Sequence, residues 1–561
     1  MKKLRILVLA LVILSSCTNN EIKDTTIKTE NKIKEEVRTE EVITPSEILK
    51  SLEQEIGVKE DIDENREEID ETASEKIENT VEEDVIKEKI EEKQPAQKEE
   101  KKNISSEKIA SLKSKGEKAI KSFSNLEMLE HSNIGIEVRE IESGEIIAQY
   151  NKGVAITPAS IMKVITSATA LEVLGADTRL ETKVVYDGKI DSEGTLTGDI
   201  YIIGGGDPTL GSDGIKKEQT AFITEWISKV KSSGIKKIKG DIIVIDNLFG
   251  YVGVEEKWLW EDFGTNYGQG TYGISVFDNL YTLYLSSTDK KIDILGTKPE
   301  IDGLKFENRL KISPRGRRDF SVRGLPFENK RVLNGEVPAN LKKIVTKSDI
   351  PNPALFLGQY FKKNLKNSGV SVSGDIKTSR NSNKRPKNPK TLAITKSATI
   401  EEMVRVLLKR SDNHYTEHLY QLLKLKDVKI SEFWKEKGID TKALVMLDGS
   451  GLSRGDYVSA SILTDILAYM NENYPEFEKL LPRGGYEGTV SDFLEPKVFD
   501  GIVRVKSGSM SGIQSYTGYI EKDGTKLAFT IIVNHWNGSR NRLKDEMEKF
   551  INNLFLLPFQ W

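Results

Sequence analysis

One apolar segment constrains the fold of this 561-residue chain most strongly. Residues 160–175, SIMKVITSATALEVLG, carry small or apolar side chains around most of the circumference when drawn as a helix, with Pro158 before them and Gly175 at the end. A helix that is hydrophobic on all sides must be enclosed by other elements. The segment therefore predicts a buried helix inside a sizeable domain, with Ser160 in its first turn and Lys163 on the same face.

Helices and strands are predicted on both sides of this segment. Before it, residues 105–123 are expected to form an amphipathic helix with a serine cap, and residues 134–151 a hairpin that turns at Ser143-Gly144. The later part of the chain predicts a helical region at 399–424, a strand at 501–509, a hairpin turning at Asp523-Gly524 and a helix at 539–554.

These patterns favour an α/β (α+β) domain with an antiparallel sheet and flanking helices. We assign residues 105–181 and 397–561 to this domain. Residues 182–396, where short strands and glycines are frequent, are assigned to a β-rich insert of one or two lobes. Within the insert, residues 258–279 are rich in aromatic residues and glycine, so they either line a pocket or form a packed loop between lobes.

The first 104 residues differ in composition from the rest. Residues 1–17, MKKLRILVLALVILSSC, join a basic start to an apolar run too short to span a membrane, which is the pattern of a signal peptide. Residues 18–104 are dominated by Glu, Lys, Ile and Thr, and no aromatic residue precedes Phe123. Such a segment cannot bury enough apolar surface to offset the entropy of ordering, so we expect a disordered tether. A coiled coil is the alternative, although Pro45 and Pro95 would interrupt it.

The single cysteine, Cys17, ends the signal-like segment. The sequence LSSC resembles the lipobox of bacterial lipoproteins, in which the cysteine becomes a lipid-modified N-terminus. One cysteine cannot form an internal disulfide, so we expect Cys17 to anchor an exported protein to a bacterial membrane, facing the periplasm or the cell exterior. An ordinary cleaved signal peptide is the alternative. The 83 basic and 87 acidic residues leave no overall positive charge that would favour nucleic acid as a partner.

Three short motifs carry candidate chemistry. Ser160 and Lys163 are placed so that the amine can reach the hydroxyl, but the pair alone is a weak signal because basic residues are common in this chain. Residues 411–413, Ser-Asp-Asn, interrupt a helical pattern either as a surface polar run or as a break in the helix, and residues 506–508, Lys-Ser-Gly, lie at the edge of a strand. In this order the three form the set found in penicillin-binding proteins and serine β-lactamases.

The chain resembles that superfamily and, more closely, the D-alanyl-D-alanine carboxypeptidase/endopeptidase family of low-molecular-mass class C, peptidase family S13. The closer resemblance rests on the long insert between the first two motifs and on the stretches TPASIMKVITSATALEVLG, GDPTL at 206–210, DGSGLSR at 448–454 and VRVKSGSMSGIQSYTGYI. It extends from about residue 105 to the end. It departs from the family at Ser507, where threonine is usual, so we expect altered packing with the hydroxyl retained.

The resemblance implies a serine-type D-Ala-D-Ala carboxypeptidase, a DD-endopeptidase or both. Such an enzyme acts on peptidoglycan peptides, needs no cofactor or metal, and is inhibited covalently by β-lactam antibiotics. Ser160 would be the nucleophile and Lys163 its general base. Ser411 would relay the proton to the leaving amine, and Asn413 would hold the substrate amide and order the lysine. We expect partial burial and the charge of Lys506 to lower the pKa of Lys163.

The third motif is implied to bind substrate. Lys506 and Ser507 would hold the terminal carboxylate of the peptide, with Gly508 completing the motif. The backbone N–H groups of Ser160 and Ser509 would form the oxyanion hole.

Three other interpretations remain open. Residues 414–418, HYTEH, match the inverted zinc signature H-x-x-E-H, in which two histidines bind the metal and Glu417 acts as base. A serine β-lactamase would share all three motifs. A catalytically weak scaffold that binds the cell wall would share the fold, although the intact motifs argue against it.

Overall fold

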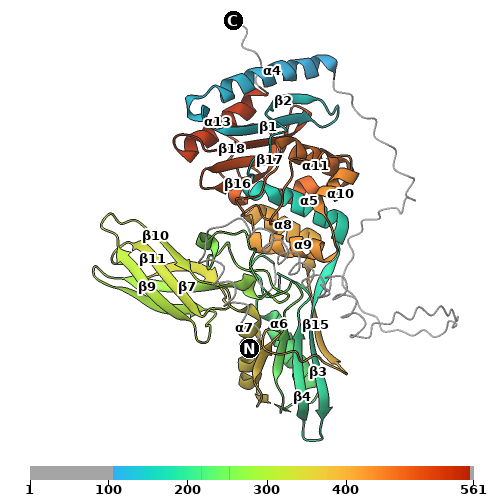
Figure 1. The fold of residues 1–561 in the computed structure, drawn as a ribbon, viewed down its shortest axis with the longest axis vertical. Helices are drawn as coiled ribbons and strands as arrows, with labels where there is room; N and C mark the ends of the chain where they lie inside the picture. The colour runs from blue at the N-terminus through green and yellow to red at the C-terminus, as the bar shows by residue number, and fades with distance from the viewer. Residues whose placement is uncertain (1–104, 216–217, 252, 556–561) are drawn as a thin grey trace, which may run out of the picture. The chain divides into compact units, whose positions relative to one another are not determined.

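The computed structural model describes residues 105–215, 218–251 and 253–555. The predicted signal peptide, Cys17 and the predicted tether at 18–104 lie outside the described residues. Within the described ranges, none of the helices combines the length and the apolar character needed to cross a membrane. The expected mixed fold with antiparallel sheets and flanking helices is confirmed (Figure 1).

A five-stranded antiparallel sheet forms the centre of one domain. Its strand order is β16-β17-β18-β1-β2, with β1 (Asn133–Glu140), β2 (Ile146–Tyr150), β16 (Ile502–Met510), β17 (Ile513–Lys522) and β18 (Thr525–Asn534). β1 and β18 pair so that Asn133 lies opposite Asn534. Both predicted hairpins are confirmed, and Gly144 (φ 72°) and Gly524 (φ 65°) take the left-handed backbone that their turns require.

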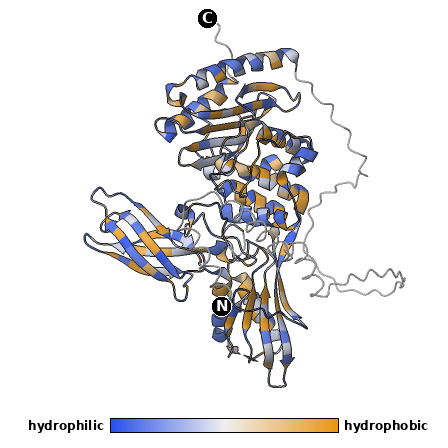
Figure 2. Cartoon of the chain, viewed as in Figure 1, coloured by the Kyte–Doolittle hydropathy of each residue, from blue (hydrophilic) through white to orange (hydrophobic). Residues whose placement is uncertain are grey.

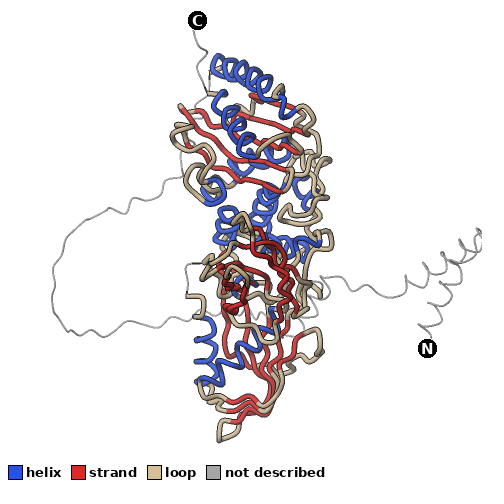
Figure 3. Tube along the Cα trace, turned by 90° about the vertical axis from the view of Figure 1, so that its left-hand side faces the viewer, coloured by secondary structure: helices blue, strands red, loops and turns tan. Residues whose placement is uncertain are grey.

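Helices cover both faces of this sheet (Figure 3). On one face α4 (Ser106–Ser124) contacts α13 (Arg540–Asn553), and on the other α11 (Ala460–Asn473) packs on β1 and β18. Side chains of β18 point alternately to the two faces of the sheet. Phe529 lies in the apolar cluster under α4 and α13, whereas Ile532 lies in the cluster around α11. Figure 2 shows hydrophobic and hydrophilic residues alternating along α4, as expected of a surface helix.

The helical region predicted at 399–424 is two helices, α8 (Ile400–Arg410) and α9 (Asn413–Leu425). A capping box of Thr399 and Glu402 begins α8. The helix breaks at Ser411, whose φ of 54° and ψ of 42° are left-handed, and Asp412 then caps α9. The Ser-Asp-Asn motif is therefore a break in the helix. The remaining helices of this part are α10 (Ile430–Glu436) and α12 (Phe477–Leu480).

The predicted apolar helix is α5 (Met162–Leu174), which contacts α8, α9 and α11. Its first ten residues are all buried, and it ends at Gly175 as predicted. Ser160 lies just before α5 in a 3₁₀ turn (Ala159–Ile161), so its placement in the first α-helical turn was wrong. The reason is local, because Ala159 takes a left-handed φ of 54° that an α-helix cannot include.

The middle of the chain carries the other sheets. One of them is a seven-stranded sheet. Its first strand in the chain is β3 (Arg179–Ile190), and its last is β15 (Lys390–Thr399); the two strands pair with each other. The other strands of this sheet are β4 (Thr195–Ile203), β5 (Lys237–Ile238), β6 (Ile242–Ile245), β13 (Ser371–Val372) and β14 (Ile376–Thr378). Two three-stranded sheets are formed by β7 (Leu280–Ser287), β8 (Ile292–Lys298), β9 (Lys305–Ile312), β10 (Asp319–Arg323), β11 (Lys330–Val337) and β12 (Ile344–Asp349). Two helices that the expected β-rich insert did not include, α6 (Ala221–Ser232) and α7 (Pro353–Asn367), pack into the same apolar core.

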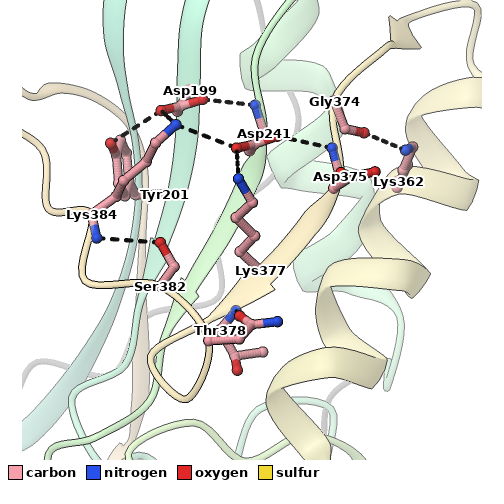
Figure 4. A network of polar contacts seen from close by, with 11 residues as sticks. Asp199, Tyr201, Asp241, Lys362, Gly374, Asp375, Lys377, Thr378, Ser382 and Lys384 are labelled. Carbon is pink, nitrogen blue, oxygen red and sulfur yellow. Dashed lines mark hydrogen bonds and ion pairs between the residues drawn. The ribbon is translucent and has the colours of Figure 1, made fainter.

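Ion pairs lie beside the middle of β4, between the residues that pair with β5 and those that pair with β6 (Figure 4). Lys377 Nζ lies 2.6 Å from Asp241 Oδ2, and Lys384 Nζ lies 3.2 Å from Asp199 Oδ2. Asp199 Oδ1 also accepts from the backbone N–H of Asp241 at 2.7 Å. Charges of both signs compensate one another here, so we assign this network a structural role within the insert.

Candidate active site

Ser160 and Lys163 meet at the start of α5. Lys163 Nζ donates hydrogen bonds to Ser160 Oγ at 2.8 Å and to the carbonyl oxygen of Ser450 at 2.7 Å. The lysine side chain is fully buried, at 0% exposure. A buried amine in contact with a hydroxyl is the arrangement of a nucleophile and its base.

Close backbone contacts hold the 3₁₀ turn before α5. β16 passes so near that a Cβ atom on Gly508 would lie 2.7 Å from the carbonyl oxygen of Pro158. Ser515 Oγ donates to the same carbonyl at 2.6 Å. From another segment, a Cβ atom on Gly451 (φ 77°) would clash with the carbonyl oxygen of Ala159. The glycine of the Lys-Ser-Gly motif is therefore needed for the strand to approach the turn.

The second and third motifs meet through a lysine. Lys506 Nζ donates to Ser411 Oγ at 2.9 Å and to the carbonyl oxygen of Ser507 at 2.6 Å. Burial, followed by the positive charge of Lys163, holds the pKa of Lys506 well below its ordinary value. The structure thus brings all three motifs, distant in sequence, into one site.

Burial lowers the pKa of Lys163 to about 8. Nearby carboxyl groups oppose this shift, and in decreasing order they belong to Asp448, Glu417, Asp412 and Asp456. The pKa of Lys163 is lowered, as expected from the sequence, but the causes expected for this shift were incomplete. Burial is complete and not partial, and the charged groups that act most strongly on Lys163 are these carboxyl groups and not Lys506.

A cleft of about 410 Å³ opens in front of these motifs. The motif residues that line it are Ser160, Ser411, Asn413 and Ser509. The insert contributes Leu259, Glu261, Asp262, Tyr267 and Arg323, and the segment after Asp448 contributes Gly451, Leu452 and Arg454. Part of the aromatic and glycine-rich segment at 258–279 therefore lines a cleft, which favours the first of its two interpretations.

Asn413 faces the cleft with a partner from the insert. Its Nδ2 donates to the carbonyl oxygen of Tyr267 at 2.9 Å. The resemblance implied that this side chain orders a lysine, whereas the bond that the structure records ties the start of α9 to the insert. The amide of Asn413 is thereby held at the wall of the cleft.

The side chains of the third motif are also held by neighbours. Ser507 Oγ lies 2.7 Å from Thr489 Oγ1. Ser509 Oγ contacts the guanidinium group of Arg540 at the start of α13, and Arg540 also donates to the carbonyl oxygen of Met510 at 2.6 Å. Arg540 of α13 therefore holds the C-terminal end of β16 in place.

The H-x-x-E-H residues are engaged in other contacts. The two oxygens of Glu417 accept from the backbone N–H groups of residues 449 and 450 at 3.0 and 2.8 Å. His418 Nε2 lies 2.9 Å from Ser275 Oγ, and its Nδ1 lies 2.7 Å from the carbonyl oxygen of His414. Across the part of the chain that the structure describes, no three or more His, Cys, Asp or Glu side chains gather as metal ligands. These contacts indicate a structural role for Glu417 and His418.

Several residues that shape the site were not identified from the sequence. The carbonyl of Ser450, which accepts from Lys163, is 287 positions away from it. Its segment, DGSGLSR, was singled out only as part of the resemblance, and its run of glycine and serine was the available signal. Thr489 and Arg540 carry no pattern that would connect them with the motifs.

Comparison with known proteins supports the family resemblance that the motifs indicated. Residues 117–554 match the family model described as D-Ala-D-Ala carboxypeptidase 3 (S13) family. The chain is 26% identical over 444 residues to a D-alanyl-D-alanine carboxypeptidase of Actinomadura sp. (strain R39), covering 73% of this chain and 79% of that protein. It is 22% identical over 431 residues to the D-alanyl-D-alanine carboxypeptidase DacB of Haemophilus influenzae, covering 73% of this chain and 86% of that protein.

The fold is also similar to a solved structure. Penicillin binding protein 4 (dacB) from Haemophilus influenzae superposes with a TM-score of 0.66 at 21% sequence identity, covering 80% of this chain and 99% of that chain. This likeness confirms the expected transpeptidase-like fold with inserted domains. Because the family match extends over most of the described residues and includes all three motifs, the chain belongs to the D-Ala-D-Ala carboxypeptidase 3 (S13) family.

Proposed function

We propose that this protein is a serine-type D-Ala-D-Ala carboxypeptidase, with or without DD-endopeptidase activity, that acts on peptidoglycan stem peptides through an acyl-enzyme on Ser160. The observation that carries the proposal is the 2.8 Å contact between Ser160 Oγ and a buried Lys163 amine whose pKa is lowered to about 8. An amine with such a pKa is neutral in part of the molecules near neutral pH and can then accept the serine proton.

In the acylation step, Lys163 Nζ takes the proton of Ser160 Oγ while Oγ forms a bond to the carbonyl carbon of the substrate. The carbon–nitrogen bond then breaks, and the proton that Lys163 took from Ser160 passes through Ser411 to the leaving amine, which returns Lys163 to its neutral form. Ser411 Oγ is 2.9 Å from Lys506 Nζ. Backbone N–H groups of Ser160 and Ser509 stabilise the negative charge that develops on the carbonyl oxygen.

In the deacylation step, water attacks the acyl-enzyme and gives up a proton to the same base. The ester bond to Ser160 Oγ breaks, the hydroxyl regains its proton, and the shortened peptide leaves as a carboxylic acid. When the leaving amine is a terminal D-Ala, the reaction is that of a carboxypeptidase. When the amine belongs to a neighbouring stem, the reaction is that of an endopeptidase.

Substrate binding is assigned to residues around the cleft. Lys506 and Ser507 are proposed to bind the terminal carboxylate. Gly508 lets strand β16 approach the turn that carries Ser160. Asn413 is proposed to hold the substrate amide. Residues 259–267 of the insert are proposed to contact the side chain of the third residue of the stem, because they line the cleft beside Ser160.

Product analysis with purified muropeptides tests this function. Release of D-Ala from monomeric stems ending in D-Ala-D-Ala supports the carboxypeptidase, and conversion of cross-linked dimers to monomers supports the endopeptidase. Ser160→Ala should abolish both. Activity that survives in Ser160→Ala and disappears with EDTA would overturn the serine mechanism in favour of a metal enzyme.

A β-lactamase is distinguished by the fate of the penicillin adduct. The peptidase is expected to keep its penicilloyl group bound for much longer than one turnover of the peptide substrate takes. Rapid hydrolysis of penicillin would favour a β-lactamase. An unreactive protein that still sediments with peptidoglycan would favour a scaffold.

The N-terminal segment is proposed to hold the enzyme at a membrane. We infer that Cys17 carries the lipid, that residues 18–104 form a tether, and that the catalytic domain consists of 105–181 and 397–561 with an insert at 182–396. The support is the lipobox-like LSSC and the single cysteine. Cys17→Ser should move the protein from the detergent phase to the aqueous phase in a Triton X-114 partition; unchanged partition would contradict the lipid anchor.

A further inference from the structure

A buried carboxylate organises the segment that holds the catalytic lysine. Asp448 is 0% exposed, and its oxygens accept from the backbone N–H groups of Ser450 at 3.0 Å, Gly451 at 2.6 Å and Ser453 at 2.7 Å. A fourth donor comes from the insert, because Trp258 Nε1 lies 2.8 Å from Asp448 Oδ2. Four donors match roughly the number of lone-pair positions on a carboxylate group, and the side chain of Asp456 also forms a hydrogen bond with Asp448.

The segment folded around Asp448 contacts α5 at the catalytic lysine. The carbonyl oxygen of Ser450 accepts from Lys163 Nζ at 2.7 Å, and the carbonyl oxygen of Gly449 accepts from Thr166 Oγ1 at 2.7 Å. Gly451 lies against the carbonyl of Ala159, next to Ser160. The position of Lys163 therefore depends on how residues 449–451 are folded.

The insert reaches this segment through a buried side chain. Trp258 is 5% exposed, and the residues that follow it, Leu259, Glu261 and Asp262, line the cleft. The same short stretch of the insert thus faces the cleft and bonds to the carboxylate that folds the lysine-binding segment. Neither Trp258 nor Asp448 belongs to any of the three motifs.

We propose that Trp258 and Asp448 are positioning residues for the general base. The indole N–H fixes the Asp448 carboxylate, that carboxylate folds residues 449–453, and the carbonyl of Ser450 then holds Lys163 Nζ against Ser160 Oγ. The insert consequently takes part in catalysis through its contact with the lysine-binding segment. This inference rests on the proposed serine-peptidase function.

A matched pair of tryptophan variants tests the proposal. Trp258→Phe removes the indole N–H and keeps most of the buried ring. Trp226→Phe is the control, because Trp226 is also buried in the insert and its Nε1 donates to Thr395 Oγ1 at 2.8 Å, within the core of the insert. Trp258→Phe should slow acylation by fluorescent penicillin by between about tenfold and a hundredfold, because a displaced base loses alignment with the serine. Trp226→Phe should leave the rate unchanged.

The titration of Lys163 provides a second readout, which reports the charge that Asp448 places beside the amine. The ionisable groups that act on this amine come from several elements: Lys506 of β16, Asp412 before α9, Glu417 of α9, and Asp448 and Asp456. Asp448→Asn removes one negative charge, so the pKa of Lys163 should fall. NMR titration of lysine-labelled protein, with the signal assigned by loss in Lys163→Arg, measures it without any reaction.

The two measurements separate the possible failures. Equal acylation rates for Trp258→Phe and Trp226→Phe, together with an unchanged Lys163 titration in Asp448→Asn, would overturn the positioning role and leave the serine mechanism standing. If the wild-type protein formed no penicilloyl adduct, the proposed function would fail, and the NMR titration would still decide whether Asp448 controls Lys163.

Discussion

Lys506 Nζ lies 2.9 Å from Ser411 Oγ, so two residues that are 95 positions apart share a hydrogen bond inside the site. Lys506 is buried, and its pKa is held well below the ordinary value by burial and by the charge of Lys163. Two amines that interact in a buried site do not both ionise readily. The site is therefore arranged to keep at least one of these two amines neutral.

Acylation should accelerate as pH rises through about 8. Burial lowers the pKa of Lys163 to about 8, and below that pH the amine is protonated and cannot accept the serine proton. The measurement is the second-order rate constant for a fluorescent penicillin as a function of pH. A midpoint near the ordinary lysine pKa of about 10.4 would show that Lys163 is not the base.

Ser411→Ala should reduce acylation by a factor of about 10²–10⁴, the range typical of losing a proton-transfer group. The variant also removes the acceptor of Lys506. Ser373→Ala is a suitable control, because Ser373 Oγ donates to the carbonyl oxygen of Ile238 in the insert, away from the motifs. If the two variants acylated equally fast, Ser411 would have no part in proton transfer.

Gly451→Ala should impair both stability and acylation. A Cβ atom there would clash with the carbonyl oxygen of Ala159, and overpacking of this kind costs about 1–3 kcal/mol. Gly438→Ala is the matched control, since Gly438 is also left-handed (φ 89°) but a Cβ atom there meets nothing within 4 Å. Thermal unfolding and penicillin acylation report the two effects. Equal losses in both variants would mean that only the left-handed backbone matters.

Asp262→Asn should raise KM for stem peptides and leave acylation by penicillin nearly unchanged. Asp262 lines the cleft with Arg323 and Arg454, and we propose that this part of the cleft contacts a peptide side chain that penicillin lacks. Steady-state release of D-Ala and penicillin acylation, measured on the same preparation, separate the two effects. A parallel loss of both activities would indicate that Asp262 supports the fold of the cleft and has no selective role in peptide binding.

Local patterns predicted much of the fold. The apolar run of α5, the serine cap of α4, the capping box of α8 and the glycine turns of both hairpins each depend on neighbouring residues, so each could be predicted directly. The left-handed Ala159, which moves Ser160 out of the α-helix, could not, because contacts with the segments around Gly451 and Gly508 hold that turn. The helices α6 and α7 were missed because the frequent glycines and short strands around them dominated the pattern.

The motifs predicted which residues meet, and long-range contacts determine how they are held. The sequence order of Ser160, Lys163 and Lys506 was enough to expect one site. It could not identify Asp448 as the carboxyl group with the largest opposing effect on the pKa of Lys163, since that effect depends on distance and burial in the folded chain. The same holds for Trp258, whose indole reaches Asp448 across 190 positions.

Mass spectrometry of the protein after reaction with penicillin tests the central claim most directly. The account predicts one penicilloyl group per molecule, mapped to the peptide that contains Ser160, and no adduct in Ser160→Ala with an unchanged unfolding temperature. An adduct on another residue, or an equal adduct in Ser160→Ala, would contradict it.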